Sequence, residues 1–256
     1  MRSAWILVVG LASGTAVAEP ARRPAPLKVT YDASHLDLEG RVLEFKLSRP
    51  ATRADLVVIG EDGTEIGTGS ATYRDQPAAA WLQIRWKQPA DARVMILKLR
   101  VVADDGRATN LELIPWSVAI DHEDVNFKTD SAVIEPGEEA KLDASLAKIA
   151  EVVKRSKRFV KMTLYVAGHT DTVGTSAKNR KLSLERARTI AKYFRRKGLA
   201  IPIAFAGFGE DVLKVKTAQE TDAPANRRAD YVIGPTGAPP FKGPYLKARA
   251  QWNRLP

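Results

Sequence analysis

The spacing of hydrophobic residues changes once along this 256-residue chain, and the change divides it into two regions. From residue 27 to about 120, hydrophobic and polar residues tend to alternate, whereas after residue 121 hydrophobic residues recur at helical spacing between short strand-like runs. Alternation buries one face of a strand, and recurrence every three or four residues buries one face of a helix. We therefore predict an α+β protein of two domains, a number that the length permits.

The first region has seven short runs with strand character, separated by turn signals such as Glu61-Asp62-Gly63 and Asp104-Asp105-Gly106. The seven runs are residues 27–31, 42–47, 56–59, 65–68, 81–86, 94–102 and 111–120. Seven strands in about 95 residues favour an antiparallel immunoglobulin-like β-sandwich over residues 27–120. Tryptophans 81, 86 and 116 are expected to pack in the core or at an edge, with an aromatic ligand platform as the alternative.

The first eighteen residues are typical of a signal peptide. Arg2 precedes an apolar run, and Ala16 to Ala18 provide a small-residue cleavage site. The run is shorter than the roughly 20 residues that a membrane-spanning helix requires, which makes a retained anchor the weaker alternative. Residues 19–26, with three prolines, are predicted to be a linker. No later segment predicts a membrane span in the mature chain.

The charge and the cysteine content limit the partners of an exported chain. A formal net charge of +10 attracts anions. Export disfavours nucleic acid and leaves cell-wall carboxylates and envelope phosphates, while a basic surface that only maintains solubility is an equally good interpretation. The absence of cysteine excludes disulfides, thiolate metal sites and a lipid-bearing cysteine.

The second region, residues 121–233, alternates strands with helices. We predict a short strand at 125–127, a helix that begins at Pro136, and a second helix at 176–197 that Gly198 ends. Further strands are expected at 159–167, 201–205 and 229–233, so the domain should be an α/β sandwich with a mixed sheet covered by helices. Residues 234–256 are rich in proline and basic residues and are predicted to be a disordered tail, with an extended strap as the alternative.

A polar constellation lies where the predicted strand 159–167 leads into the second helix. The loop 168–174 contains Asp171, and Asn179 and Arg186 follow at a spacing of seven on the helix. Seven residues are nearly two helical turns, so Asn179 and Arg186 can face the same cleft as the loop.

Several motifs occur in the order and at the spacing of a known family. The chain resembles the OmpA-like (OmpA/MotB C-terminal) peptidoglycan-binding domain over residues 124–233 or thereabouts. The matching motifs are Asn126-Phe127 with Ser131, Gly168-His169-Thr170-Asp171, Asn179, Leu182-Ser183-x-x-Arg186-Ala187, Gly207-Phe208-Gly209-Glu210 and Asn226-Arg227-Arg228.

The resemblance implies that Asp171 and Arg186 bind the diaminopimelate side chain of the peptidoglycan stem peptide. The chemistry is consistent, because the free end of diaminopimelate carries an ammonium for the acid and a carboxylate for the guanidinium. The predicted binding set also includes Asn179, Thr129, Asp130, Leu182 and Arg227.

Structural alternatives to these roles remain open at this stage. Asp171 and Arg186 could instead form an internal salt bridge, and Arg227 could pair with a nearby acid. Lys128 departs from the family pattern and could repel the ligand's ammonium or reach a carboxylate. The loop 211–225 lacks the glycine that often precedes the Asn-Arg-Arg motif, which leaves its conformation open.

The sequence predicts a non-catalytic protein without a metal or a cofactor. Its three histidines, at positions 35, 122 and 169, have no zinc-site spacing, and no nucleophile or phosphate-binding motif is present. We expect a protein of the periplasm or cell envelope of a Gram-negative bacterium, with outer-membrane association left open. It would tether residues 27–120, which could bind an envelope protein, to the wall. The alternative is an envelope adaptor in which the sandwich is the functional part and the wall-binding pocket is inactive.

Overall fold

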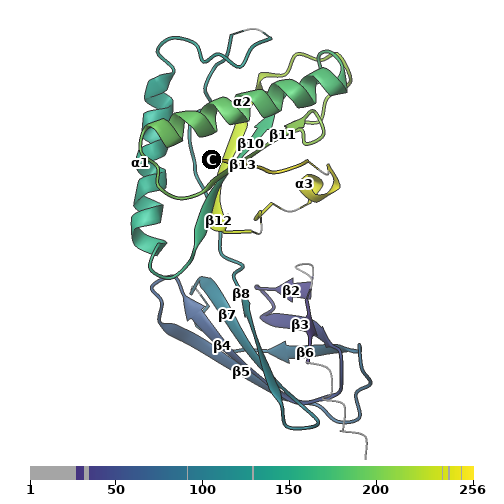
Figure 1. The fold of residues 1–256 in the computed structure, drawn as a ribbon. Helices are drawn as coiled ribbons and strands as arrows, with labels where there is room; N and C mark the ends of the chain where they lie inside the picture. Colours follow the sequence, from purple (N-terminus) through teal and green to yellow (C-terminus); the bar gives the residue numbers. More distant parts are fainter. Residues whose placement is uncertain are drawn as a thin grey trace, which may run out of the picture.

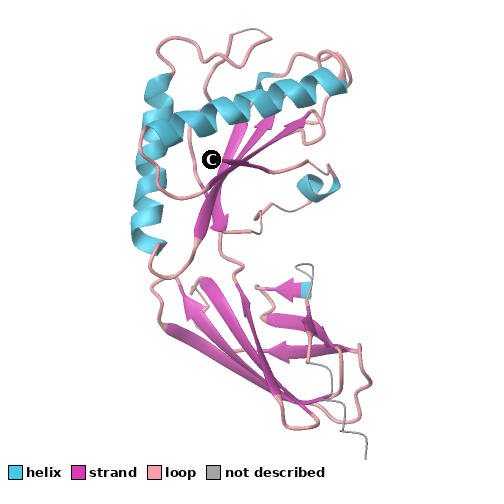
Figure 2. Cartoon of the chain, in the orientation of Figure 1, coloured by secondary structure: helices cyan, strands magenta, loops and turns pink. Residues whose placement is uncertain are grey.

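The structure is a computed structural model that describes residues 27–31, 35–90, 92–128, 130–237, 239–241, 243–248 and 250–256 (Figure 1). The predicted signal peptide, the linker 19–26 and Thr129 lie outside these residues. Figure 2 shows the two long helices only in the C-terminal half of the chain, whereas the N-terminal half consists almost entirely of strands and loops. No helix in the described ranges is long and apolar enough to span a bilayer.

The N-terminal half consists of two antiparallel sheets. In the first sheet, β3 (Val42–Leu47) pairs with β1 (Val29–Thr30), β2 (Leu36–Asp37) and β6 (Trp81–Arg85). The second sheet has the order β5-β4-β7-β8. Its strands span Ala51–Gly60 (β4), Glu65–Thr72 (β5), Val94–Ala103 (β7) and Ala108–Leu113 (β8).

The two sheets enclose one apolar core. Alternate residues of the central strands point inward, among them Phe45 on β3, Leu56 on β4 and Leu97 on β7. This is the burial pattern that the period of two predicts. Trp86 and Trp116 are buried as expected, whereas Trp81 is 43% exposed because it lies on the outer face of β6. The sandwich architecture is present, and its immunoglobulin-like character stays a prediction.

The predicted strand 111–120 was wrong in its extent, because the structure divides it. β8 ends at Leu113, and Pro115, which has no N–H to donate, follows in the connection. β9 (Val118–Ala119) then pairs with β12 (Ala229–Pro235) in the C-terminal sheet. The C-terminal sheet thus begins before the predicted boundary at residue 120, and Trp116 packs in its core.

The C-terminal half is a mixed sheet of order β13-β11-β10-β12-β9. β10 (Met162–His169) runs parallel to β11 (Ile203–Gly209) and antiparallel to β12, as an α/β sandwich requires. The helices are α1 (Glu139–Ser156) and α2 (Ser176–Arg196), with a short 3-10 helix at Pro224–Asn226. The predicted strand 125–127 was wrong, since Phe127 makes only an isolated bridge with Ile134.

Helix α2 lies directly on the backbone of β10 and β11 because two glycines face it. A Cβ atom on Gly168 would be 2.2 Å from the carbonyl oxygen of Ser183, and one on Gly207 would be 2.4 Å from the nitrogen of Leu184. Any larger residue would displace the helix. These two glycines therefore fix the position of α2 relative to the ends of both strands.

The prediction that residues 234–256 are disordered was wrong, and the alternative, an extended strap, describes them. The strap contains α3 (Pro244–Lys247) and β13 (Asn253–Leu255), which pairs antiparallel with β11. Three of its aromatic residues, Phe241, Tyr245 and Trp252, pack on Phe208 of β11. Because the strap covers one face of the sheet and the helices the other, every residue of β10 is buried.

The strap should contribute measurably to stability. Trp252→Ala is expected to lower the free energy of unfolding by about 2 kcal/mol, less than for a fully buried tryptophan because this side chain is half-buried. Leu246→Ala in the same strap is the matched control, since Leu246 is 70% exposed, and should change it by less than about 0.5 kcal/mol. Urea unfolding measures both variants. Equal effects would show that the strap does not pack as described.

Candidate functional site

A hollow of about 580 Å³ lies beside the end of β10. Its walls come from the segment before α1, the loop after β10, one face of α2 and the segment that leads into β12. All the predicted binding residues that the structure describes line it, namely Asp130, Asp171, Asn179, Leu182, Arg186 and Arg227. The structure thus brings together residues that are up to 97 positions apart in the sequence.

Asp171 lies two residues after the end of β10 and forms a salt bridge with Arg227. Its Oδ2 accepts a hydrogen bond of 2.6 Å from Arg227 Nη1, and its Oδ1 accepts a longer one of 3.3 Å from the Val173 N–H. Arg227 also forms an ion pair with Asp222. The hydrogen bond from Arg227 to Asp171 raises the pKa of Arg227, while burial opposes this effect. The structural alternative for Arg227, pairing with a nearby acid, therefore holds, although Arg227 also lines the hollow.

Arg186 is half-buried without an acidic partner. Its Nε donates to the carbonyl oxygen of Ser131 at 3.0 Å, and its guanidinium lies 5.0 Å from the centre of the Phe127 ring. Among the described residues none forms a salt bridge with Arg186, so the alternative of an internal pair with Asp171 is not realised. Burial and then the positive charge of Arg227 lower the pKa of Arg186. A guanidinium stays charged nonetheless, so the hollow holds a cation that an anionic ligand can neutralise.

Asn179 positions the loop rather than presenting a free amide. Its side chain is buried, and its Nδ2 donates to Glu210 Oε2 at 2.7 Å and to the backbone oxygen of Asp171 at 3.3 Å. These bonds hold Asp171 next to the start of α2. The sequence showed Glu210 only as part of a motif, and its contact with Asn179 explains why an acid stands there.

Asp130 and Lys128 contribute less to the hollow than the sequence suggested. Asp130 forms a salt bridge of 2.8 Å with Lys178, and because both side chains are more than half exposed, solvent weakens this pair. Lys128 is exposed and does not line the hollow. Phe127, in contrast, lines it, and its ring lies against the guanidinium of Arg186; the sequence indicated the Phe127 segment through the Asn126-Phe127 motif but not this role of the ring.

His169 lines the hollow and also contacts Tyr245 of the strap. Its Nε2 is 3.0 Å from Asp230 Oδ2, and Asp230 in turn accepts a hydrogen bond from Tyr245 of the strap. Burial lowers the pKa of His169. Because Tyr245 lies outside the matching motifs, no pattern in the sequence could have shown this contact. No group of three histidine, aspartate or glutamate residues in the described parts of the chain could hold a metal ion.

His122 holds the segment before α1, which forms one wall of the hollow, against β12. Its Nδ1 and Nε2 lie 2.7 Å and 2.8 Å from the carbonyl oxygens of Ile120 and Ala229, and its ring stacks on Tyr231. A carbonyl oxygen only accepts hydrogen bonds, so both contacts are hydrogen bonds only when the ring is protonated and both nitrogens donate. Burial lowers the pKa of His122, but Asp124 and the two carbonyls raise it by more, and the net pKa lies above its ordinary value.

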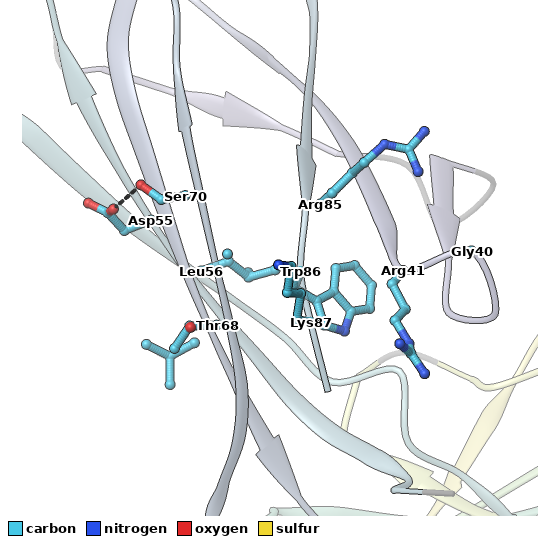
Figure 3. A pocket seen from close by; sticks show the side chains of 11 residues that line it. Gly40, Arg41, Asp55, Leu56, Thr68, Ser70, Arg85, Trp86 and Lys87 are labelled. Atoms are coloured by element: carbon cyan, nitrogen blue, oxygen red, sulfur yellow. Dashed lines mark hydrogen bonds between the residues drawn. The ribbon is translucent and has the colours of Figure 1, made fainter. Parts of the chain in front are cut away.

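A second hollow, of about 690 Å³, lies in the N-terminal half where β5 meets the segment after β6 (Figure 3). In this view Arg41 and Arg85 extend from one side, and Asp55 accepts a hydrogen bond from Ser70 on the other. A Cβ atom on Gly67 would be 2.1 Å from the Lys87 carbonyl oxygen, so the absence of a side chain lets the two backbones meet. None of the predicted binding residues lines this hollow.

Residues 126–227 match the model of the OmpA family, and this segment is therefore an OmpA-like domain. Outer membrane protein P5 of Haemophilus influenzae is 39% identical over 88 residues, which are 34% of this chain and 23% of that protein. Outer membrane porin F of Pseudomonas fluorescens is 30% identical over 111 residues, 43% of this chain and 32% of the porin. The chain thus spans a third or less of the length of these relatives.

Solved structures also resemble part of the chain. The peptidoglycan-associated lipoprotein from Burkholderia pseudomallei is 24% identical, with a TM-score of 0.35 over 44% of this chain and 90% of that one. The periplasmic domain of Helicobacter pylori MotB is 15% identical, with a TM-score of 0.36 over 48% and 82%. At such scores the assignment of the domain rests on the sequence match.

The state of His122 predicts a pH dependence. The folded chain holds this proton more tightly than the unfolded chain, so the stabilisation is complete below about pH 6.5 and is lost as the pH rises through the raised pKa. His122→Phe, which keeps the contact with Tyr231, should be less stable than the wild type at pH 6 and should approach it by pH 9. Thermal unfolding across this range measures the difference. Parallel pH profiles would contradict a protonated His122.

Proposed function

We propose that the chain is a non-catalytic protein of the Gram-negative cell envelope whose OmpA-like domain binds peptidoglycan through the diaminopimelate of the stem peptide. The observation that carries the proposal is the half-buried Arg186, which has no acidic partner among the described residues and shares a hollow with the carboxylate of Asp171. Names of relatives that refer to the outer membrane support the envelope location.

The two ends of the ligand fit two different groups in the hollow. The carboxylate of diaminopimelate would accept hydrogen bonds from Arg186, whose planar guanidinium suits a carboxylate. The ammonium would donate to Asp171 Oδ1, which among the described residues accepts only the 3.3 Å bond from Val173, while Oδ2 keeps its partner Arg227. Arg227 would thus hold the acid in place, and Leu182, Asp130 and Thr129 would contact the rest of the stem peptide.

The N-terminal half would be held at the wall and could bind an envelope protein. We propose that residues 27–113 are an immunoglobulin-like sandwich, because a sheet with β3 between β1 and β6 faces one of order β5-β4-β7-β8, an arrangement typical of that class. No catalytic step, cofactor or nucleic acid partner forms part of the proposal. The signal peptide remains part of it and would deliver the chain to the periplasm.

The alternative function is an adaptor with an inactive pocket, in which Lys128 would repel the ligand's ammonium. That side chain is exposed and does not line the hollow, so it gives no support to an inactive pocket. Retention of the chain by purified sacculi at increasing salt concentration separates the two functions. Binding through a basic surface alone decreases steeply as the salt concentration rises, whereas binding through the pocket should persist better.

Changing either charge in the hollow should weaken the retention by sacculi. Arg186→Ala or Asp171→Asn is expected to cost about 2 to 5 kcal/mol of binding, because each leaves the opposite charge of the ligand without its partner. Lys157→Ala, which removes an exposed charge that does not line the hollow, should cost less than about 0.5 kcal/mol. Sedimentation with sacculi at moderate salt measures all three. Wild-type retention of the Arg186 and Asp171 variants would refute the proposal.

A further inference from the structure

Helix α2 has a second polar face, turned away from the hollow of Asp171. At about 100° per residue, positions 181, 185, 188, 192, 195 and 196 fall within one arc of roughly 100°. Asn179, Leu182 and Arg186 lie on a different arc. The first arc borders a groove of about 800 Å³, which β11 and β13 close on the other side, and Figure 1 shows α2 crossing over these strands.

The groove carries an excess of positive charge. It is lined by one acidic side chain, Glu185, and by six cationic ones: Lys181, Arg188, Lys192, Arg195, Arg196 and Arg254. None of the six forms a salt bridge with another described residue. Arg195 donates from Nη1 to the Leu199 carbonyl oxygen at 2.5 Å, and its buried Nε has no partner in the described parts of the chain. Uncompensated like charges at close range repel each other, so an anionic ligand would be stabilised there.

The groove also offers apolar contacts and a free strand edge. Leu184, Phe205 and Leu255 line it between the cations. β13 is the last strand of its sheet and pairs only with β11, so within the described residues no strand pairs with its other edge. An unpaired edge is a template for another extended chain.

We propose that this groove binds an acidic, extended segment of a partner protein, which adds to the sheet beside β13 with its carboxylates toward α2. Alternate residues of a strand are about 7 Å apart, close to the roughly 6 Å between helix residues four positions apart, such as Arg188 and Lys192. A groove between a helix and a strand accommodates a single extended chain, whereas a bilayer presents a flat surface. This site is distinct from the proposed peptidoglycan site and does not depend on it.

A charge-reversal experiment on the full chain tests the proposal. The probe is a fluorescent peptide of about eight residues that alternates glutamate and valine, a length that spans the roughly 22 Å of the groove face. Lys181→Glu with Lys192→Glu should raise its Kd at least about tenfold, as measured by anisotropy. Lys157→Glu with Lys161→Glu is the matched control, since it makes the same change of charge at two exposed lysines outside the groove, and should raise the Kd less than about twofold.

Two further arms test the extended conformation and the class of ligand. The same peptide with every backbone amide N-methylated keeps its charges but has no N–H to donate to β13 on either edge, and should bind about tenfold more weakly. Polyphosphate and phosphatidylglycerol vesicles should bind without distinguishing the two double variants. Failure of the peptide to bind, equal losses in both variants, undiminished binding of the methylated peptide, or groove-dependent binding of polyphosphate or vesicles would each overturn the proposal. The Lys181/Lys192 variant should be retained by sacculi like the wild type, because neither lysine lines the hollow of Asp171. A loss of peptide binding in this variant can therefore be distinguished from a loss of peptidoglycan binding.

Discussion

The contact of α2 with the bare backbone of β10 and β11 is the constraint on which the rest of the site depends. Gly168 and Gly207 allow this contact, since a Cβ atom at either position would overlap the helix backbone. The contact places Asn179 where its amide reaches both the Asp171 backbone and Glu210, and it brings Arg186 to the same hollow. Gly168 and Gly207, which belong to two different motifs, thus determine the position of Arg186, which belongs to neither.

In the hollow, Asp171 and Arg227 form a salt bridge, whereas Arg186 forms none with the described residues. Arg227 neutralises Asp171 and holds it in place, whereas Arg186 lies half-buried between Phe127 and the Ser131 carbonyl and forms no salt bridge within the described part of the chain. An internal pair of Asp171 with Arg186 would leave little for a ligand to gain. The observed arrangement supports a ligand that carries both charges, because it can add a carboxylate to Arg186 and an ammonium to the remaining oxygen of Asp171.

Much of the fold and the position of the site could be predicted, because they depend on local patterns. Alternation predicted the paired sheets, helical spacing predicted α1 and α2, and the motifs predicted which side chains meet in the hollow. That Arg227 could pair with an acid was an alternative, but that the acid is Asp171 could not be predicted, since it depends on how the loop before β12 folds. The strap was predicted only as an alternative because its composition suggested disorder, whereas three separated aromatic residues cover Phe208. Composition describes an average and does not show which surface is available for a segment to cover.

The proposed pocket is tested most directly by competition between two soluble stem peptides for the retention of the full chain by sacculi. The peptides differ only at the third residue, which is meso-diaminopimelate in one and lysine in the other. Lysine keeps the ammonium for Asp171 but lacks the carboxylate for Arg186, so the diaminopimelate peptide should compete at least about tenfold better, the factor that corresponds to 1.4 kcal/mol. Equal competition by the two peptides would show that Arg186 does not bind the ligand's carboxylate.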